Sequence, residues 1–199
     1  MPEALVVRCP NCGLPAAQGD KECEACGSPI TVPSMSMLGG MGTLQLNKME
    51  HGFNDVLNNP DAKDKASAHM SLGFIYMKLG LYEKADNHFD QAIDACVENP
   101  DLFYTAAISL LGGKKAYLCP RDKIEKAERY LQIAIELEPR GVFYYFWAYI
   151  RYDFYSRRFY SCKPTYQEIL RDARANGVNG QDVRDLFELL KVDIPSAIQ

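Results

Sequence analysis

The sequence lacks the apolar stretches that secretion and membrane insertion require. Met1 to Arg8 contains no apolar core of signal length, and no run approaches the roughly 18 apolar residues of a membrane-spanning helix. It also lacks a nucleophile elbow, a zinc-hydrolase helix, a dinucleotide fingerprint and a phosphate-binding loop. We therefore expect a cytoplasmic protein that is not an enzyme and has no membrane partner.

Basic charge is scarce, especially near the N-terminus. The 199 residues carry a formal net charge of −4. Residues 1–33 contain two basic and four acidic side chains and no aromatic residue. Because phosphate binding favours a basic stripe, this segment is not expected to hold nucleic acid.

The same segment contains two Cys-x-x-Cys pairs, Cys9 with Cys12 and Cys23 with Cys26, and a glycine follows each pair. A tetrahedral zinc ion takes four thiolates at about 2.3 Å, and two tight turns that face each other supply them. The segment resembles the zinc-ribbon family over roughly residues 5–32, which implies bound Zn²⁺. With four thiolate ligands no position stays open for water, so the ribbon is expected to be structural.

Two alternatives to zinc remain open for these cysteines. Iron of the rubredoxin type normally comes with aromatic packing, which residues 1–33 lack. Disulfides or free thiols form the second alternative, and a reducing cytosol favours metal over disulfides.

Composition divides the rest of the chain. Residues 31–43 hold no charge and contain Pro33 and three glycines, which predicts a flexible connection. We therefore expect a ribbon over residues 1–32, a linker over 33–43 and a helical domain over 44–199.

The helical domain is predicted from apolar residues at helical spacing between short breaks containing glycine, proline or asparagine. The expected helices span residues 44–58, 64–79, 82–97, 100–111, 122–138, 142–156, 164–175 and 181–191. Outside the ribbon no window alternates as a strand, so the fold class is expected to be all-α.

Residues 66–99 contain a pattern of small and large apolar side chains at the spacing of a known repeat. The pattern consists of Leu72, Gly73, Tyr76, Ala85, Phe89 and Ala92. Gly73 and Ala85 are small where two antiparallel helices would approach closely. The segment resembles the tetratricopeptide repeat family, and Ala127, Leu131 and Ala134 repeat the second half of the pattern. The resemblance implies stacked helix pairs that form an α-solenoid.

Tetratricopeptide proteins generally bind peptides or partner proteins on their concave surface. At the corresponding positions of the best repeat this chain places Met70, Phe74, Met77 and Lys78. These residues depart from the Lys- and Asn-rich clamp that some members use for a C-terminal carboxylate. An apolar ligand segment therefore fits them better.

Residues 143–160 hold eleven of the 22 aromatic side chains, and residues 140–163 have a local net charge of about +4. One interpretation is a central helix buried between its neighbours. The other is a binding surface, because Trp, Tyr and Arg dominate interface hot spots. Trp147, Arg151 and Tyr155 are its candidate contacts.

Two functions follow from these patterns. The first is a non-enzymatic adaptor or scaffold that binds a partner protein or peptide through the repeats. The alternative is a nucleic-acid-associated factor that uses the ribbon together with residues 140–163 for base stacking and phosphate contacts.

Overall fold

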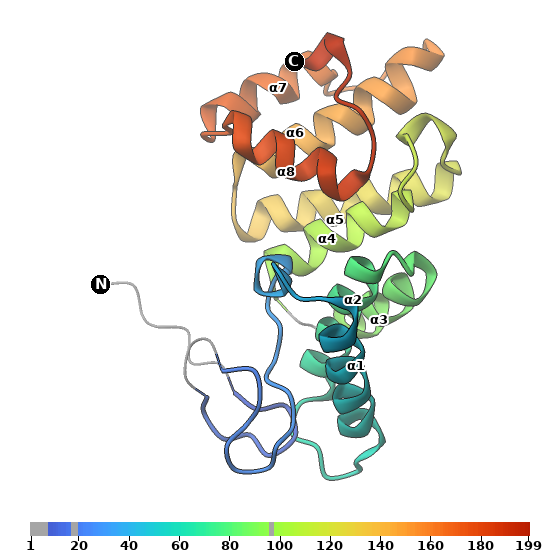
Figure 1. Cartoon of the computed structure of the whole chain (residues 1–199). Coiled ribbons are helices and arrows are strands. Elements are labelled where there is room, and N and C mark those ends of the chain that lie inside the picture. The colour runs from blue at the N-terminus through green and yellow to red at the C-terminus, as the bar shows by residue number, and fades with distance from the viewer. Residues whose placement is uncertain (1–7, 17–19, 96–97) are drawn as a thin grey trace. The chain divides into compact units, whose positions relative to one another are not determined.

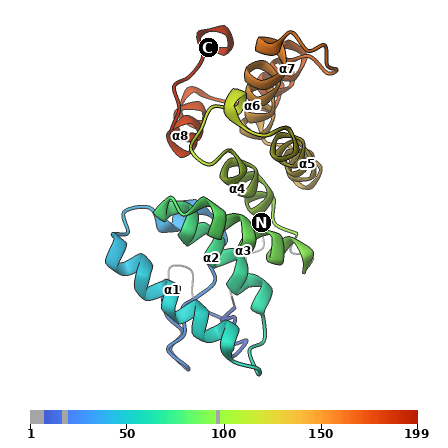
Figure 2. The same cartoon turned by 90° about the vertical axis from the view of Figure 1, so that its right-hand side faces the viewer.

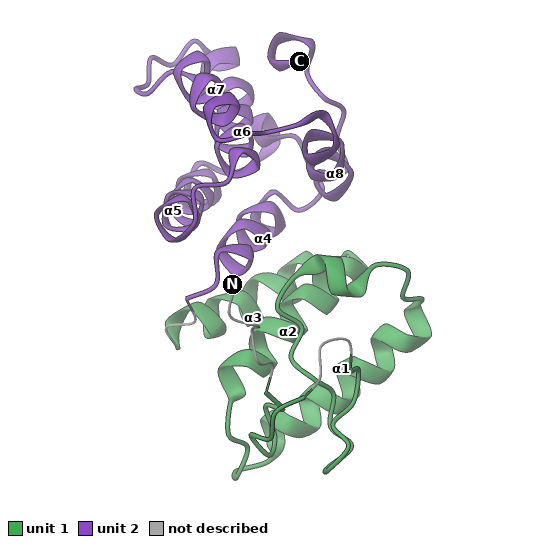
Figure 3. Ribbon diagram, turned by 90° about the vertical axis from the view of Figure 1, so that its left-hand side faces the viewer, with its two compact units in different colours: residues 1–97 green, residues 98–199 purple. Residues whose placement is uncertain are grey.

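The computed structural model describes residues 8–16, 20–95 and 98–199 (Figure 1). The chain forms two compact units, residues 1–97 and residues 98–199 (Figure 3). The boundary between them lies where the third helix ends and the fourth begins. It coincides with neither predicted boundary, at residue 32 or at residue 43.

Helices form both units. The first unit contains α1 (Thr43–Asn58), α2 (Lys65–Leu79) and α3 (Tyr82–Asp94). The second contains α4 (Pro100–Leu111), α5 (Arg121–Leu137), α6 (Gly141–Ile150), α7 (Tyr166–Ala175) and α8 (Gly180–Leu190). Over residues 8–16, 20–95 and 98–199 the backbone forms only two isolated β-bridges and no strand. The predicted all-α class is confirmed for this part of the chain.

Most helix boundaries follow local signals in the sequence. At the start of α4 the Asn99 side chain accepts hydrogen bonds from the Asp101 and Leu102 amides, and Pro100 occupies the first turn. The helix ends at Gly112, whose φ of 60° lies in the left-handed region that glycine adopts without strain. The predicted end of the third helix at Val97 lies outside the described residues.

The aromatic helix differs from its prediction. Instead of running to residue 156, α6 ends at Ile150 and continues as the π-helical turn η3 (Arg151–Tyr155) and the 3₁₀ turn η4 (Ser156–Arg158). A π turn takes up an extra residue and shifts the direction of the side chains after it. Hydropathy spacing contains no signal for such a shift.

In the first unit, α2 packs against both α1 and α3. The close approach of α2 to α3 depends on Gly73, because a Cβ atom there would lie 2.4 Å from the Phe89 ring. Phe74 meets the same ring edge-to-face at 5.5 Å between centroids. A small residue facing a large one at this crossing is what the sequence pattern predicts.

The predicted linker has defined structure in this unit. Residues Met35–Leu38 form the 3₁₀ turn η1, which packs against α2, and Leu38 is fully buried. The amide of Val32 donates a hydrogen bond to Ser71 Oγ at 2.9 Å. Residues 32–38 are therefore attached to α2.

In the second unit, α4 pairs with α5 and α6 pairs with α7, while α8 packs against α4 and α6 (Figure 2). Phe187 of α8 contacts Tyr149 and Tyr145 edge-to-face, with ring centroids 5.1 and 6.4 Å apart. Tyr145 also donates a hydrogen bond through its hydroxyl to the Ile198 carbonyl at 2.6 Å. The aromatic side chains of α6 thus form much of the core of this unit.

Candidate functional site

The two Cys-x-x-Cys segments fold into nearly identical turns. In the first, the Cys9 amide donates to the Leu14 carbonyl and the Gly13 amide donates to the Cys9 carbonyl, both at 2.8 Å. In the second, the amides of Cys23 and Gly27 make the equivalent bonds, again at 2.8 Å. Gly13 and Gly27 have φ values of 78° and 70°, which explains why a glycine follows each pair.

These turns bring the four sulfur atoms together. Sγ of Cys9 lies 3.6 Å from Sγ of Cys26, and Sγ of Cys12 lies 3.7 Å from Sγ of Cys23. All four lie within 4.8 Å of one another. Tetrahedral zinc with bonds of about 2.3 Å places its ligand sulfurs roughly 3.8 Å apart, whereas a disulfide needs about 2.05 Å. The four free thiols can therefore hold a metal ion.

The protonation of these thiols is uneven. Desolvation acts to raise the pKa of Cys26, but hydrogen bonds from the backbone and side chain of Ser28 outweigh it and lower the pKa to about 6. Burial raises the pKa of Cys9 to about 12. Cys26 therefore loses its proton more readily than Cys9, and metal binding must displace the proton of Cys9.

The ribbon has a small core of its own. Among its described residues, Cys9, Cys23 and Ile30 form one buried cluster, with Cys12 and Ala16 packed against it. So little apolar surface cannot hold a segment of this length folded. Metal coordination would supply that free energy.

The first turn of the ribbon is attached to the loop between α1 and α2. The amide of Asp64 donates to the Pro10 carbonyl at 2.8 Å, and the amide of Lys63 donates to the Asn11 carbonyl at 3.2 Å. Asn59 Nδ2 donates to Asn11 Oδ1 at 2.7 Å. The two residues between Cys9 and Cys12 thus connect the first cysteine turn to the helices.

The second turn of the ribbon packs against α1. A Cβ atom at Gly52 would lie 2.7 Å from the Pro29 ring, so this glycine permits the contact. Lys48 of α1 forms an exposed ion pair with Glu22 at 2.5 Å, which contributes little to stability at such an exposed position. A cavity of about 250 Å³ separates the two segments nearby, lined in part by Met41, Met49 and Gly52.

The four predicted contact residues of α2 differ in accessibility. Met70, Phe74 and Met77 are buried, and Lys78 is exposed. A partner contact through the three apolar side chains stays a prediction, and their burial does not favour it. Lys78 alone presents its side chain to solvent.

The three candidate contacts in the aromatic segment are brought together around an acidic residue. Glu128 of α5 is buried and accepts hydrogen bonds from Trp147 Nε1 at 3.0 Å and from the Tyr155 hydroxyl at 2.8 Å. Arg151 Nε lies 2.5 Å from Glu128 Oε1, and its guanidinium lies between the Trp147 and Tyr155 rings, 5.5 and 5.0 Å from their centroids. The Trp147 and Tyr155 donors are therefore hydrogen-bonded within the protein, and Arg151 is paired with Glu128 by charge, although its Nε makes no hydrogen bond.

Sequence reasoning missed Glu128. A single glutamate on an amphipathic helix has no motif, and the seven other charged residues of α5 are all exposed or half-buried. The only available signal was the excess of basic residues in the aromatic segment, which is compatible with an acidic partner on another helix.

The arginines and aromatic rings of residues 140–163 are largely committed to similar contacts. Arg140 pairs with Asp101 at 2.9 Å, and Arg157 pairs with Asp153 at 2.5 Å. Of the eleven aromatic side chains, only Phe159 and Tyr160 are exposed. Base stacking needs open ring faces, so most of this segment lacks the surface that nucleic-acid binding requires.

None of the described helices is both long and apolar enough to span a bilayer. Comparisons with protein-family models, with curated proteins and with solved structures find no match to this chain.

Proposed function

We propose that this chain is a non-enzymatic adaptor, a tetratricopeptide-like repeat protein that binds a partner protein and carries a structural Zn²⁺ ribbon. The observation that carries the proposal is the close crossing of α2 and α3 at Gly73 and Phe89. The other positions of the repeat pattern, Leu72, Tyr76, Ala85 and Ala92, are all buried at this helix pair.

Further support comes from the second unit, where helices pair in the same sequential order, α4 with α5 and α6 with α7. Ala127, Leu131 and Ala134, which repeat the second half of the pattern, are fully buried on α5. Stacked helix pairs of this kind present extended surfaces suited to protein partners.

The proposed role of the ribbon follows from its chemistry and its contacts. Four thiolates would close the coordination sphere of Zn²⁺, which excludes a metal-bound water and therefore hydrolysis at the metal. The ribbon also binds the α1–α2 loop through Pro10 and Asn11. We infer that the metal stabilises the first unit of the adaptor.

The test is capture of partners from the native cell on the full, zinc-loaded chain, followed by reconstitution with the purified partner. We expect a stoichiometric complex with a partner protein that forms from the purified components without any nucleic acid. Recovery of nucleic acid alone, with affinity that falls steeply with salt, contradicts the proposal.

A further inference from the structure

Two segments of the second unit contain basic residues without any acidic ones. The first, residues 112–121, runs from the end of α4 to the first residue of α5, and the second, residues 156–163, follows η3. Together they contain six basic side chains and no acidic side chain: Lys114, Lys115, Arg121, Arg157, Arg158 and Lys163. This local excess contrasts with the net charge of −4 for the whole chain.

The structure joins these two segments through a buried acid. Asp153 of η3 is almost fully buried and accepts hydrogen bonds from the Tyr117 amide at 2.7 Å and from Arg157 at 2.5 Å. Arg158 donates to the Tyr117 carbonyl. The guanidinium carbons of Arg157 and Arg158 lie 4.8 and 4.7 Å from the centroid of the Tyr117 ring. These contacts hold both segments in one fixed arrangement.

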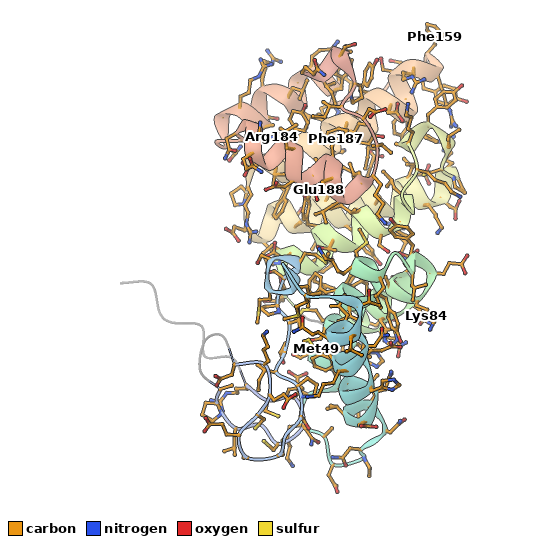
Figure 4. All side chains as sticks on the ribbon, viewed as in Figure 1. Met49, Lys84, Phe159, Arg184, Phe187 and Glu188 are labelled. Carbon is orange, nitrogen blue, oxygen red and sulfur yellow. The ribbon has the colours of Figure 1, made fainter. Side chains whose placement is uncertain are left out.

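This arrangement presents apolar side chains to solvent. Phe159 is 96% exposed, Leu118 is 67% exposed and Tyr160 is 54% exposed. We name Tyr117, Leu118, Phe159 and Tyr160 the tip. Figure 4 shows the Phe159 side chain projecting from the end of its segment, away from the adjacent helices. Exposed apolar residues that gather in this way mark interaction sites.

The backbone at the tip is itself unusual. Phe159 has a φ of 59°, in the left-handed region that bulky residues rarely adopt. Such a conformation usually persists only where the surrounding structure determines it. Here the Phe159 and Tyr160 amides donate to the Ser156 and Tyr155 carbonyls, both at 3.0 Å, so the turn that exposes Phe159 is fixed.

A recess adjoins the tip. Phe159, Tyr160, Cys162 and Tyr166 are among the residues that line a cavity of about 320 Å³, open to solvent. Ser156 and Ser161 belong to the same lining. The recess has room for a side chain of a bound protein.

We propose that the tip is the surface on which the adaptor binds an acidic segment of its partner, with apolar side chains between the carboxylates. This inference rests on the proposed adaptor function and names the partner chemistry. Carboxylates would meet Lys114, Lys115 and the stacked guanidinium of Arg158, while apolar side chains would cover Phe159 and Leu118. Tyr, Phe and Arg in one cluster are the composition of interface hot spots.

One feature favours a protein segment over a lipid surface. The recess beside Phe159 and Tyr160 matches the protruding side chain of a protein, and a bilayer surface has no such protrusion.

The test uses the full zinc-loaded chain and three labelled ten-residue peptides, with binding followed by fluorescence anisotropy. The first peptide alternates glutamate with leucine around a central phenylalanine. The second replaces each glutamate by lysine, and the third replaces each apolar residue by serine. We expect binding of the first peptide only, and weaker binding as salt is raised.

Variants of the chain locate the binding surface. Combining Leu118→Ser with Phe159→Ser should weaken binding of the first peptide at least tenfold, as should Lys114→Glu combined with Lys115→Glu. Leu44→Ser is the matched control, because Leu44 is 85% exposed in the first unit; it should bind as wild type. Circular dichroism verifies that each variant is folded.

Several results overturn the proposal. The first is that the first peptide does not bind, and the second is that the tip variants bind it as tightly as the wild type. The third is that the wild-type chain binds phosphatidylserine vesicles or a single-stranded oligonucleotide and the tip variants do not. If the tip variants retain the captured partner complex with unchanged affinity, the adaptor function stands and the role of the tip falls.

Discussion

Nδ1 of His69 lies 2.9 Å from Nδ1 of His88, and the two rings face each other across the α2–α3 pair. At this distance one ring donates a hydrogen bond and the other accepts it, so at least one of the two must be neutral. Tyr76 stacks on His88 at 5.3 Å between centroids and donates its hydroxyl to Glu50 at 2.7 Å. The histidines therefore belong to the packing of the first helix pair.

This pair predicts acid sensitivity of the first unit. Burial, then the charges of His69 and Lys84, lower the pKa of His88 to about 4, and the nearby Glu50 only partly opposes them. Burial and Lys65 also lower the pKa of His69. An unfolded histidine has a pKa of about 6.5, so the unfolded chain binds more protons between pH 6.5 and pH 4. Stability is therefore full above pH 6.5 and falls as the pH drops toward 4.

After allowance for solvent screening of these half-buried groups, we expect a loss of about 1–2 kcal/mol over that window. Urea unfolding at pH 7.5, 6 and 4.5 measures it. His88→Gln should flatten the profile, and His51→Gln, at an exposed position on α1, should leave it unchanged. An unaltered pH slope in His88→Gln would refute the assignment.

Metal removal should expose two particular amides. Lys63 and Asp64 donate to the Asn11 and Pro10 carbonyls beside the metal-binding cysteines. Because the ribbon core is too small to fold alone, chelation should unfold it and release both amides. We expect their hydrogen exchange to accelerate at least tenfold, while amides of α5 in the second unit retain their rates.

Mass spectrometry of the native protein provides the matching control for stoichiometry. One zinc per chain should be present before chelation and none after it. Iron in place of zinc, or full protection of Lys63 and Asp64 in the metal-free chain, would contradict the proposed zinc-dependent ribbon.

The helix crossing at Gly73 should not tolerate a methyl group. A Cβ atom there would lie 2.4 Å from the Phe89 ring, so Gly73→Ala must displace the ring. The overpacking cost exceeds the gain of about 1 kcal/mol in helix propensity, and we expect a net destabilisation of about 1–3 kcal/mol. Chemical denaturation measures it.

Two further variants make this result specific. Phe89→Leu in the Gly73→Ala background should restore part of the loss, since the smaller side chain leaves room for the methyl group. Gly42→Ala is the control, because no atom lies within 4 Å of its Cβ position. Equal effects at Gly42 and Gly73 would show that the crossing is not the cause.

The sequence predicted what depends on spacing along the chain. The two Cys-x-x-Cys pairs, each followed by a glycine, indicated the four-sulfur cluster. Gly73 and Phe89 indicated the close packing of the α2–α3 pair. The sequence did not predict contacts between residues that lie far apart along the chain and belong to no motif. Neither the His69–His88 pair nor the attachment of Asn11 to residues 59–63 has a local signature, because each depends on how separate elements pack.

The aromatic segment shows the same limit. Its composition was compatible with a buried helix and with a binding surface. Nine of its eleven rings are buried or half-buried, and the binding surface stays a prediction. Trp147 and Tyr155 donate hydrogen bonds to Glu128. Phe159 is exposed because it follows η4 with a left-handed backbone conformation. Backbone geometry, which composition does not encode, separates the two groups.

Glu128 should be the most sensitive charged residue of the second unit. Its removal by Glu128→Ala leaves the largely buried Arg151 without its counterion and two donors without an acceptor. Breaking a buried pair in this way costs about 3–5 kcal/mol, and Glu128→Gln, which keeps an acceptor, should cost less. Trp147 is the only tryptophan, so its fluorescence reports directly on the site. We expect a red-shifted emission in Glu128→Ala and a smaller shift in Glu128→Gln.

Glu125→Ala, which removes an exposed partner of Arg121 on the same helix, should change stability by less than about 0.5 kcal/mol. Equal losses in the two alanine variants would mean that helix α5, and not the buried cluster, determines the effect.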